Sequence, residues 1–450
     1  MSTSINPYTG EALCHFTAIT DETLYQKVAD SGQAFKAWRL QKTEERAVLL
    51  RRVGEKLRSG KHHYARTITV EMGKPITQAL AEVEKCAWVC DYYAANAARF
   101  LEDRTESTEA ARSYVRFEPL GPVLAIMPWN YPFWQVIRFA APSLSAGNTC
   151  LLKHAPNVWQ CAGELQQLFE ESGYPPGVFQ TLYIGEPQVE GVLADPRVRA
   201  LTLTGSTRAG AAVAALCGKY LKKTVLELGG SNAMIVFPDA DLDKAVETCI
   251  ESRFQNTGQS CIATKRLLLH QSISAEFTDK LLKQVRALKA GDPMDPETYI
   301  GVMAREDLAG QLEAQMKNSL DMGAVLACGG KREGTFFEPT ILLGVTESMP
   351  VFREETFGPL LAVSTFEDEG AALRLAGKSR FGLGVSLFTR DPARVQRMIP
   401  LLEEGAVFVN SMVKSDPRLP FGGVKDSGYG RELSVEGIRE FVNVKTVYIP

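Results

Sequence analysis

The sequence lacks a long hydrophobic run. No stretch of its 450 residues approaches the roughly 18 consecutive apolar residues that are needed to cross a bilayer. Its start, MSTSINPYTGEALCHF, also lacks the basic region and apolar core of a secretory signal. We therefore expect a cytoplasmic protein with no membrane partner.

A strong excess of one charge is also missing. The chain has 50 basic and 53 acidic residues, which gives a formal net charge of -3 at pH 7. This balance argues against a protein that binds nucleic acid through bulk positive charge.

The spacing C-x-x-C does not occur, although the chain has nine cysteines. An odd number of scattered cysteines suits a reducing compartment rather than a disulfide framework, and it indicates no structural zinc. Asp239, Asp241 and Asp243 resemble the start of a calcium loop, but Lys244 stands where that loop needs glycine. A helix cap is the better interpretation, and we predict no metal site.

What the chain does have is the pattern of an α/β protein. Helical spacing over residues 20–58 is followed, from about residue 120, by short apolar runs such as PVLAIM and RALTLT that alternate with amphipathic segments. This alternation is typical of a parallel sheet covered on both faces. It restarts after Gly229 and Gly230, which predicts two α/β domains with a joint there. The last residues, FVNVKTVYIP, alternate like an exposed strand, and such a strand tends to find a partner.

Two turns after predicted strands have the chemistry of binding sites. In LTLTGSTRAG, Gly205 and Ser206 lie between a strand and a helix, where free N–H groups favour phosphate, although an ordinary turn would look the same. In MPWNYP, two prolines stiffen the turn that holds Trp129 and Asn130. A fixed amide could stabilise an oxyanion; from this hexapeptide alone, an aromatic turn at a domain interface is the favoured alternative.

Three acidic or nucleophilic side chains stand out further along. Glu227 in LELGG follows an apolar strand, so burial would raise its pKa toward that of a general base, unless it is a strand-end charge in solvent. Cys261 in QNTGQSCIATK has small polar neighbours that predict an accessible sulfur, and a helix N-terminus there would favour the thiolate. Glu355 belongs to REETFGP, which alone indicates little.

Together and in this order, these stretches resemble the NAD(P)-dependent aldehyde dehydrogenase family. The resemblance runs from NPYTGE near residue 6 to PFGGVKDSGYGRE at 420–432 and covers essentially the whole chain. It implies a Rossmann-like cofactor domain (1–109 and 122–228) and a catalytic domain (229–433), both doubly wound parallel-sheet domains. It also implies a small β oligomerisation element (110–121 and 434–450), and hence a homodimer or homotetramer.

The resemblance also implies a role for each motif residue. Cys261 would be the nucleophile, Glu227 the base that activates water, and Asn130 an oxyanion donor. The product would form through a thiohemiacetal and a thioester. The cofactor, NAD or NADP, would be held by Trp129, Lys153, Pro156, Gly205, Ser206, Glu355 and Phe357.

Substrate and cofactor choice depend on a few further positions. Arg138 stands where succinate-semialdehyde dehydrogenases carry an arginine for the distal carboxylate, and the chain resembles their small bacterial branch. Gln255 replaces a second arginine that some of these enzymes have, and Arg418 is a candidate substitute. The alternative for Arg138 is an ion pair at a domain contact. Pro156 occupies a position where NAD-selective relatives often have glutamate, so NADP is not excluded.

The expected activity is therefore the NAD(P)-dependent oxidation of succinate semialdehyde to succinate. Two rivals stay open at this stage. One is oxidation of another short aldehyde, such as glutarate semialdehyde. The other is a catalytically silent binding protein on the same fold.

Overall fold

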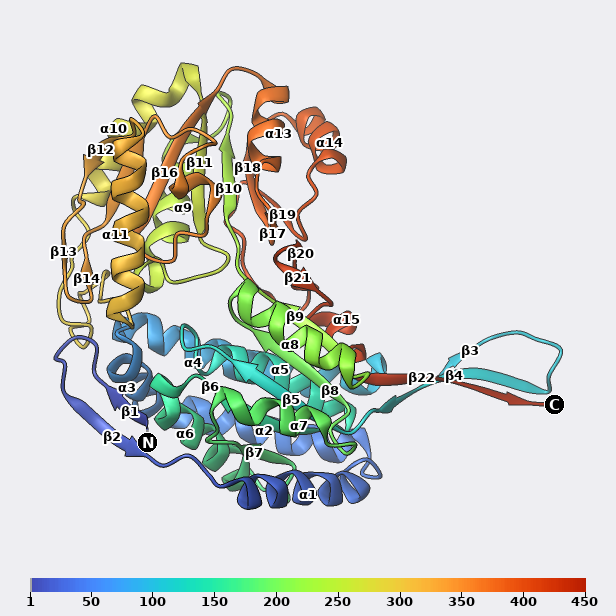
Figure 1. Cartoon of the computed structure of the whole chain (residues 1–450). Coiled ribbons are helices and arrows are strands. Elements are labelled where there is room, and N and C mark those ends of the chain that lie inside the picture. The colour runs from blue at the N-terminus through green and yellow to red at the C-terminus, as the bar shows by residue number, and fades with distance from the viewer. Residues whose placement is uncertain (1) are drawn as a thin grey trace.

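The structure is a computed structural model that describes residues 2–450. Two large lobes, each built on a mainly parallel sheet, lie one above the other, and a narrow arm projects from the lower lobe (Figure 1). Within the described residues, no helix is both long enough and apolar enough to pass through a membrane.

The lower lobe contains a six-stranded sheet in the order β21-β9-β8-β5-β6-β7. Five of its strands are parallel, and β21 pairs with β9 in the antiparallel direction. The strands are β5 (Pro122–Met127), β6 (Thr149–His154), β7 (Phe179–Thr181), β8 (Ala200–Thr204), β9 (Lys223–Glu227) and β21 (Gly428–Tyr429).

Helices bury both faces of this sheet. On β5, Leu124 belongs to the core on one face, whereas Val123 and Ala125 belong to the core on the other. The helices of this lobe are α1 (Asp21–Trp38), α2 (Thr43–Ser59), α3 (Lys61–Met72), α4 (Ile76–Phe100), α5 (Trp134–Ala146), α6 (Trp159–Glu171), α7 (Val189–Ala194), α8 (Thr207–Lys219) and α15 (Ser434–Arg439).

The upper lobe contains a seven-stranded sheet in the order β12-β15-β16-β11-β10-β18-β19, with only β12 antiparallel to its neighbour. Its strands are β10 (Asn232–Val236), β11 (Thr264–His270), β12 (Val325–Cys328), β15 (Thr340–Leu343), β16 (Leu360–Phe366), β18 (Val385–Phe388) and β19 (Val407–Val409). Its helices are α9 (Leu242–Phe254), α10 (Ser274–Val285), α11 (Glu306–Asp321), α12 (Pro350–Arg353), α13 (Glu369–Gly377) and α14 (Pro392–Met398).

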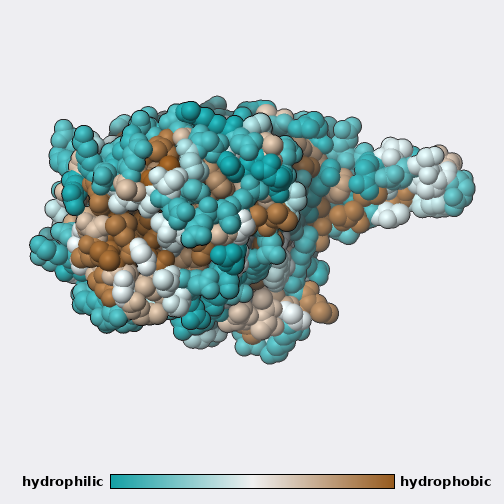
Figure 2. Space-filling view, turned by 90° about the horizontal axis from the view of Figure 1, so that it is seen from above, coloured by the Kyte–Doolittle hydropathy of each residue, from teal (hydrophilic) through white to brown (hydrophobic). Residues whose placement is uncertain are grey.

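The arm is a separate antiparallel sheet. Strand β22 (Val442–Ile449) pairs along its whole length with β4 (Arg112–Pro119), which also pairs with β3 (Arg104–Thr105). The arm extends beyond the rest of the molecule, with hydrophobic residues among hydrophilic ones on its surface (Figure 2). Three of its side chains, Val444, Tyr448 and Ile449, are about half exposed.

The remaining strands form three small antiparallel pairs. They are β1 (Ser2–Ile5) with β2 (Ala12–Phe16), β13 (Arg332–Glu333) with β14 (Phe336–Phe337), and β17 (Phe381–Gly382) with β20 (Val424–Lys425).

The predicted α/β fold class is confirmed. Most expected strands coincide with observed ones, and Asp241 caps α9 through its side chain, as the sequence indicated. Two features differ from the prediction. Strand β15 was not anticipated, because its apolar run is only three residues long. The apolar run VFQTLYI (178–184) predicts a strand of seven residues, but the observed strand, β7, covers only Phe179–Thr181. The proposed domain limits stay a prediction.

Candidate active site

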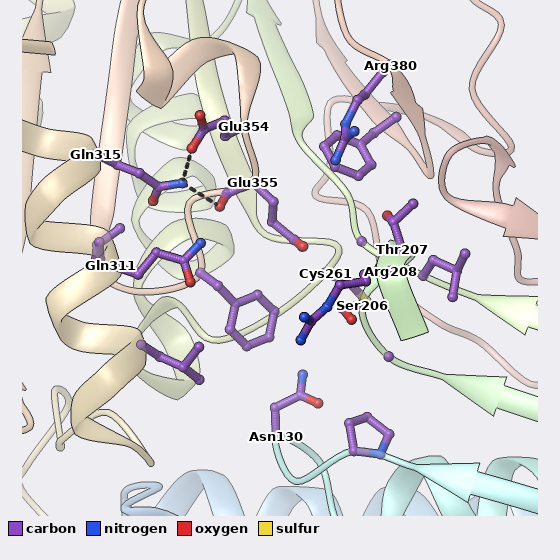
Figure 3. Close-up of a pocket in the computed structure, with 18 of the residues that line it drawn as sticks. Asn130, Ser206, Thr207, Arg208, Cys261, Gln311, Gln315, Glu354, Glu355 and Arg380 are labelled. Atoms are coloured by element: carbon purple, nitrogen blue, oxygen red, sulfur yellow. Dashed lines mark hydrogen bonds between the residues drawn. The ribbon is translucent and has the colours of Figure 1, made fainter. Parts of the chain in front are cut away.

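A cavity of about 1180 Å³ opens between the two lobes. Its lower wall is formed by the ends of β5, β8 and β9. Chain order along the sheet reverses between β5 and β8, and such a switch point is where α/β proteins bind ligands. Four of the predicted site residues face each other across it, because Asn130 and Ser206 come from the lower lobe and Cys261 and Glu355 from the upper one (Figure 3).

Cys261 lies in a turn between a short 3₁₀ segment, η3 (Gln255–Gly258), and β11. The expectation of a helix N-terminus at the thiol is wrong, since a strand follows. The turn is unusual because Asn256, Thr257 and Gly258 all have a positive φ, of 54°, 53° and 70°. A Cβ on Gly258 would lie 2.4 Å from the carbonyl oxygen of Gly358, so only glycine fits. This strained turn holds the backbone just before Cys261 in a fixed conformation.

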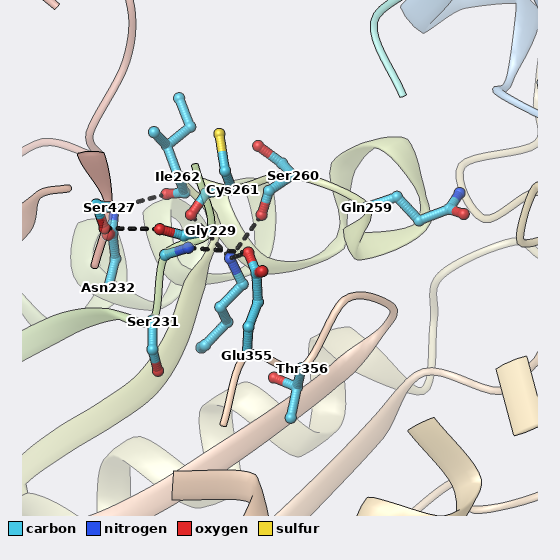
Figure 4. A network of polar contacts seen from close by, with 12 residues as sticks. Gly229, Ser231, Asn232, Gln259, Ser260, Cys261, Ile262, Glu355, Thr356 and Ser427 are labelled. Atoms are coloured by element: carbon cyan, nitrogen blue, oxygen red, sulfur yellow. Dashed lines mark hydrogen bonds and ion pairs between the residues drawn. The ribbon is translucent and has the colours of Figure 1, made fainter. Parts of the chain in front are cut away.

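Burial raises the pKa of the Cys261 thiol to about 11, and the largest opposing effect is the positive charge of Lys265. Lys265 Nζ donates to the carbonyl oxygens of Ser260 (2.7 Å) and Cys261 (2.8 Å), and to Glu355 Oε1 (3.2 Å). In this network, the sulfur points away from the carbonyl groups that hold the ammonium (Figure 4). The resting thiol is therefore protonated at neutral pH, beside a cation that favours its thiolate.

Asn130 follows β5 and is buried. The side-chain Nδ2 of Asn130 donates to the main-chain oxygen of Gln259 (3.0 Å). The main-chain oxygen of Asn130 accepts from Asn256 Nδ2 (2.8 Å). Two hydrogen bonds thus tie the loop after β5 to the turn that carries Cys261. The amide is held at the cavity wall, as an oxyanion donor requires.

Glu355 and Phe357 line the same cavity. Glu355 Oε1 also accepts from the Gly230 N–H (3.0 Å), and a Cβ on Gly229 would lie 2.5 Å from Glu355 Oε2. The glycine pair therefore allows the carboxylate to approach the backbone closely. The Phe357 ring meets Trp129 edge to face, with 5.7 Å between centroids.

The residues expected to hold the nucleotide phosphates and ribose lie at the carboxyl edge of the lower sheet. Ser206 caps α8, where its Oγ accepts from the Ala209 N–H (3.2 Å), and both Gly205 and Ser206 line the cavity. Lys153 lies near the end of β6, and Pro156 follows that strand. Neither residue lines the cavity. Burial lowers the pKa of Lys153, opposed by Glu186. Free N–H groups at a helix N-terminus, a cation and a cavity of this size fit a dinucleotide.

Glu227 ends β9 and is only 2% exposed. Neither of its carboxylate oxygens has a hydrogen-bond partner within residues 2–450. Burial, followed by the nearby Glu432 carboxylate, raises the pKa of Glu227 well above the usual range of a carboxyl group. It does not line the cavity that contains the Cys261 side chain.

Comparison with known proteins agrees with this geometry. The model of the aldehyde dehydrogenase family matches residues 2–447. The chain belongs to the aldehyde dehydrogenase family. It is 45% identical over 449 residues to a probable succinate-semialdehyde dehydrogenase (NADP(+)) of Synechocystis, with 99% of both chains covered. It is 46% identical over 454 residues to succinate-semialdehyde dehydrogenase (NADP(+)) 1 of Mycobacterium tuberculosis H37Rv, again with 99% of both covered.

A solved structure supports the same assignment. The succinic semialdehyde dehydrogenase from Streptococcus pyogenes, in complex with NADP+ as the cofactor, superposes with a TM-score of 0.97 and is 38% identical over the full length of both chains.

The three substrate candidates of this aldehyde dehydrogenase have different surroundings. Arg138 Nε lies 2.5 Å from a Glu432 carboxylate oxygen, and its guanidinium covers the Phe421 ring at 4.7 Å. The alternative interpretation of Arg138 was a surface or interface ion pair; the structure shows an ion pair, but a buried one. Gln255 Nε2 faces the Met412 sulfur at 3.9 Å, and Arg418 is mostly exposed and paired with Asp416 at 2.7 Å. None of the three lines the cavity.

Sequence reasoning missed three residues that shape this site. Lys265 and Asn256 lie within four or five positions of Cys261 and have ordinary polar identities, so only the folded contacts show their roles. Glu432 lies in the segment PFGGVKDSGYGRE. The glycines of this segment indicate tight turns, and that signal could have pointed to the segment around Glu432.

Proposed function

We propose that this protein oxidises succinate semialdehyde to succinate, with NADP or NAD as the hydride acceptor. The observation that carries the proposal is one cavity lined by Cys261, Asn130 and Glu355 at the switch point of a parallel sheet. The named activity of the relatives supports the choice of substrate.

Each residue would contribute one step. The Cys261 thiol would first lose its proton to solvent, and the thiolate would then attack the aldehyde carbon, while the Asn130 amide and the Cys261 N–H hold the resulting oxyanion. The bound nicotinamide nucleotide supplies the chemistry of hydride acceptance, which leaves a thioester on Cys261. Glu227 then takes a proton from water, and the activated water releases the acid.

NADP is the proposed preferred cofactor, with NAD as a second acceptor. Pro156 offers no carboxylate that would repel a 2′-phosphate, and Lys153 provides a nearby cation. The NADP-dependent names of the relatives support this order.

A kinetic panel tests the proposal. Reduced nucleotide is followed by absorbance for NAD and NADP, each with succinate semialdehyde, glutarate semialdehyde and butanal. We expect the highest kcat/KM for succinate semialdehyde with NADP. A higher value for butanal would contradict the substrate assignment, and no turnover with any aldehyde would favour a silent binding protein.

Self-association in the cytoplasm completes the proposal. The exposed edge of the β22–β4 arm suits pairing with a second copy of the chain, as a homodimer or homotetramer. All nine cysteines are unpaired within the described chain, which suits a reducing compartment.

A further inference from the structure

His154 is a buried, titratable side chain that the reaction described above does not use. It ends β6, and its side chain is shielded from solvent. Its Nε2 lies 2.9 Å from the main-chain oxygen of Pro132, and its Nδ1 lies 3.2 Å from that of Met127. The ring therefore contacts both ends of the loop 127–132, which carries Asn130.

The hydrogen bonds of the ring determine its tautomer. Nδ1 accepts from the Ala155 N–H (2.9 Å), and a neutral imidazole has one donor and one acceptor. The proton therefore lies on Nε2, which donates to the Pro132 oxygen. Burial, the largest effect, lowers the pKa of His154 to about 4, so the neutral ring persists at neutral pH.

The bond from His154 holds the carboxyl end of the loop. Within residues 2–450, no other group donates a hydrogen bond to the Pro132 oxygen. Glu82 of α4 accepts from the next two N–H groups, those of Phe133 (2.9 Å) and Trp134 (3.0 Å), at the start of α5. The Pro132 carbonyl thus depends on His154 alone.

The loop places Asn130 between two sets of hydrogen bonds. Asn256 and Gln259 hold it from the upper lobe, whereas His154 holds the loop from the lower sheet. The Asn130 amide faces the cavity that contains Cys261 (Figure 3). A displacement of about 1 Å at a reacting group can lower a rate by about 100-fold, so the anchor on the lower sheet matters for the oxyanion donor.

We propose that His154 is a positioning residue, which fixes the loop so that the Asn130 amide meets the oxyanion of the reaction. The inference rests on the proposed function. His154 does not line the cavity, so it acts through Asn130 and not on the substrate.

Two substitutions of similar polarity separate the two ring nitrogens. His154→Gln puts an amide nitrogen near the place of Nε2, so that it can still donate to Pro132. His154→Asn reaches only the place of Nδ1 and loses that bond. We expect His154→Asn to lower kcat for succinate semialdehyde by about 10-fold or more and His154→Gln to keep most of it. KM for NADP should stay within about 2-fold in both, because β6 keeps its main-chain pairing with β5 beside Lys153.

A double-mutant cycle shows whether His154 acts through Asn130. In the Asn130→Ala background, where the donor is gone, His154→Asn should lower kcat by no more than about 2-fold, although it lowers the Tm in both backgrounds. A role in stability alone would give the same loss of kcat with and without Asn130. His154→Leu, which removes both hydrogen bonds and keeps a large side chain, should show the same pattern as His154→Asn.

Thr181→Val is the matched control. It removes a buried hydrogen bond from a side chain of the neighbouring strand β7 to the Ala162 carbonyl oxygen (2.9 Å). It should lower the Tm and leave kcat within about 2-fold. An unchanged kcat in His154→Asn and His154→Leu, or an equal loss in both Asn130 backgrounds, would overturn the inference. A wild-type protein that oxidises no aldehyde would instead refute the proposed function itself.

Discussion

At the scale of single residues, the proposed chemistry depends on how two buried acids ionise. The Cys261 thiol has a pKa raised to about 11, so its thiolate fraction should grow about tenfold per pH unit below that value. Iodoacetamide should therefore alkylate the free protein about tenfold faster at pH 9 than at pH 8. Peptide mass mapping at Cys261 measures this rate, with Cys261→Ala as the control that also abolishes activity. A rate independent of pH would show that the thiolate already predominates.

Asn130→Ala should lower kcat by about 100-fold or more, the typical effect of losing one oxyanion donor. The fold should persist, because the Gln259 carbonyl keeps its hydrogen bond from Asn256 Nδ2 (3.0 Å). Asn256→Ala is the contrasting variant, since it removes that bond and the bond to the Asn130 carbonyl. Steady-state kinetics and thermal melts should show a catalytic loss for the first variant and a lower Tm for the second.

Glu227→Gln should let the acyl-enzyme accumulate, which appears as a burst of reduced nucleotide near one per site. It should also stabilise the protein at high pH. Because the pKa of Glu227 is higher in the folded than in the unfolded chain, its carboxyl destabilises the fold increasingly as pH rises above the unfolded value. The Tm gain should be about 2 °C or more at pH 8 and vanish near pH 4. An equal Tm at pH 8 would mean that Glu227 ionises normally.

At the scale of elements, a buried ion pair fastens α5 to the segment after β21. Arg138→Met should lower stability by about 3 kcal/mol or more, because it leaves Glu432 buried without its partner. Arg138→Met with Glu432→Gln should recover most of this loss. Denaturation of the two variants measures the difference, and equal stabilities would exclude the pair as the cause.

Strands were predictable where the sequence carries a clear apolar run. The runs 122–127 and 360–366 coincide with β5 and β16, since a strand buried on both faces reads as a continuous apolar run. The pairing of Arg138 with Glu432 was not predictable. These two residues are far apart along the chain and meet only after the strands around them have paired.

At the scale of the whole molecule, the arm is the feature that suits association. Removal of residues 443–450 should leave β4 without its long partner, so that only the short strand β3 still pairs with it. We expect the truncated chain to sediment as a smaller species than the full chain in analytical ultracentrifugation. Circular dichroism should confirm that both lobes stay folded. An unchanged mass would place the contact elsewhere.

The cavity shows why motif order predicted the site better than any single motif. Cys261, Asn130 and Glu355 come from separate loops, and their meeting depends on the carboxyl ends of the lower strands facing the amino ends of the upper strands. The family resemblance supplied that arrangement. The position of Glu227 outside the cavity depends on side-chain packing against the 421–432 segment, which no local pattern reveals.

The burial of Glu227 outside the cavity has a consequence for timing. A base in this position cannot compete for the thiol proton at the start of the cycle, and it must rotate toward the sulfur before water can be activated. Hydrolysis of the thioester would then need a rotation of the Glu227 side chain as well as bond breaking. Added viscogen, which slows diffusion in solvent, should therefore leave the rate of thioester hydrolysis unchanged, because Glu227 is buried.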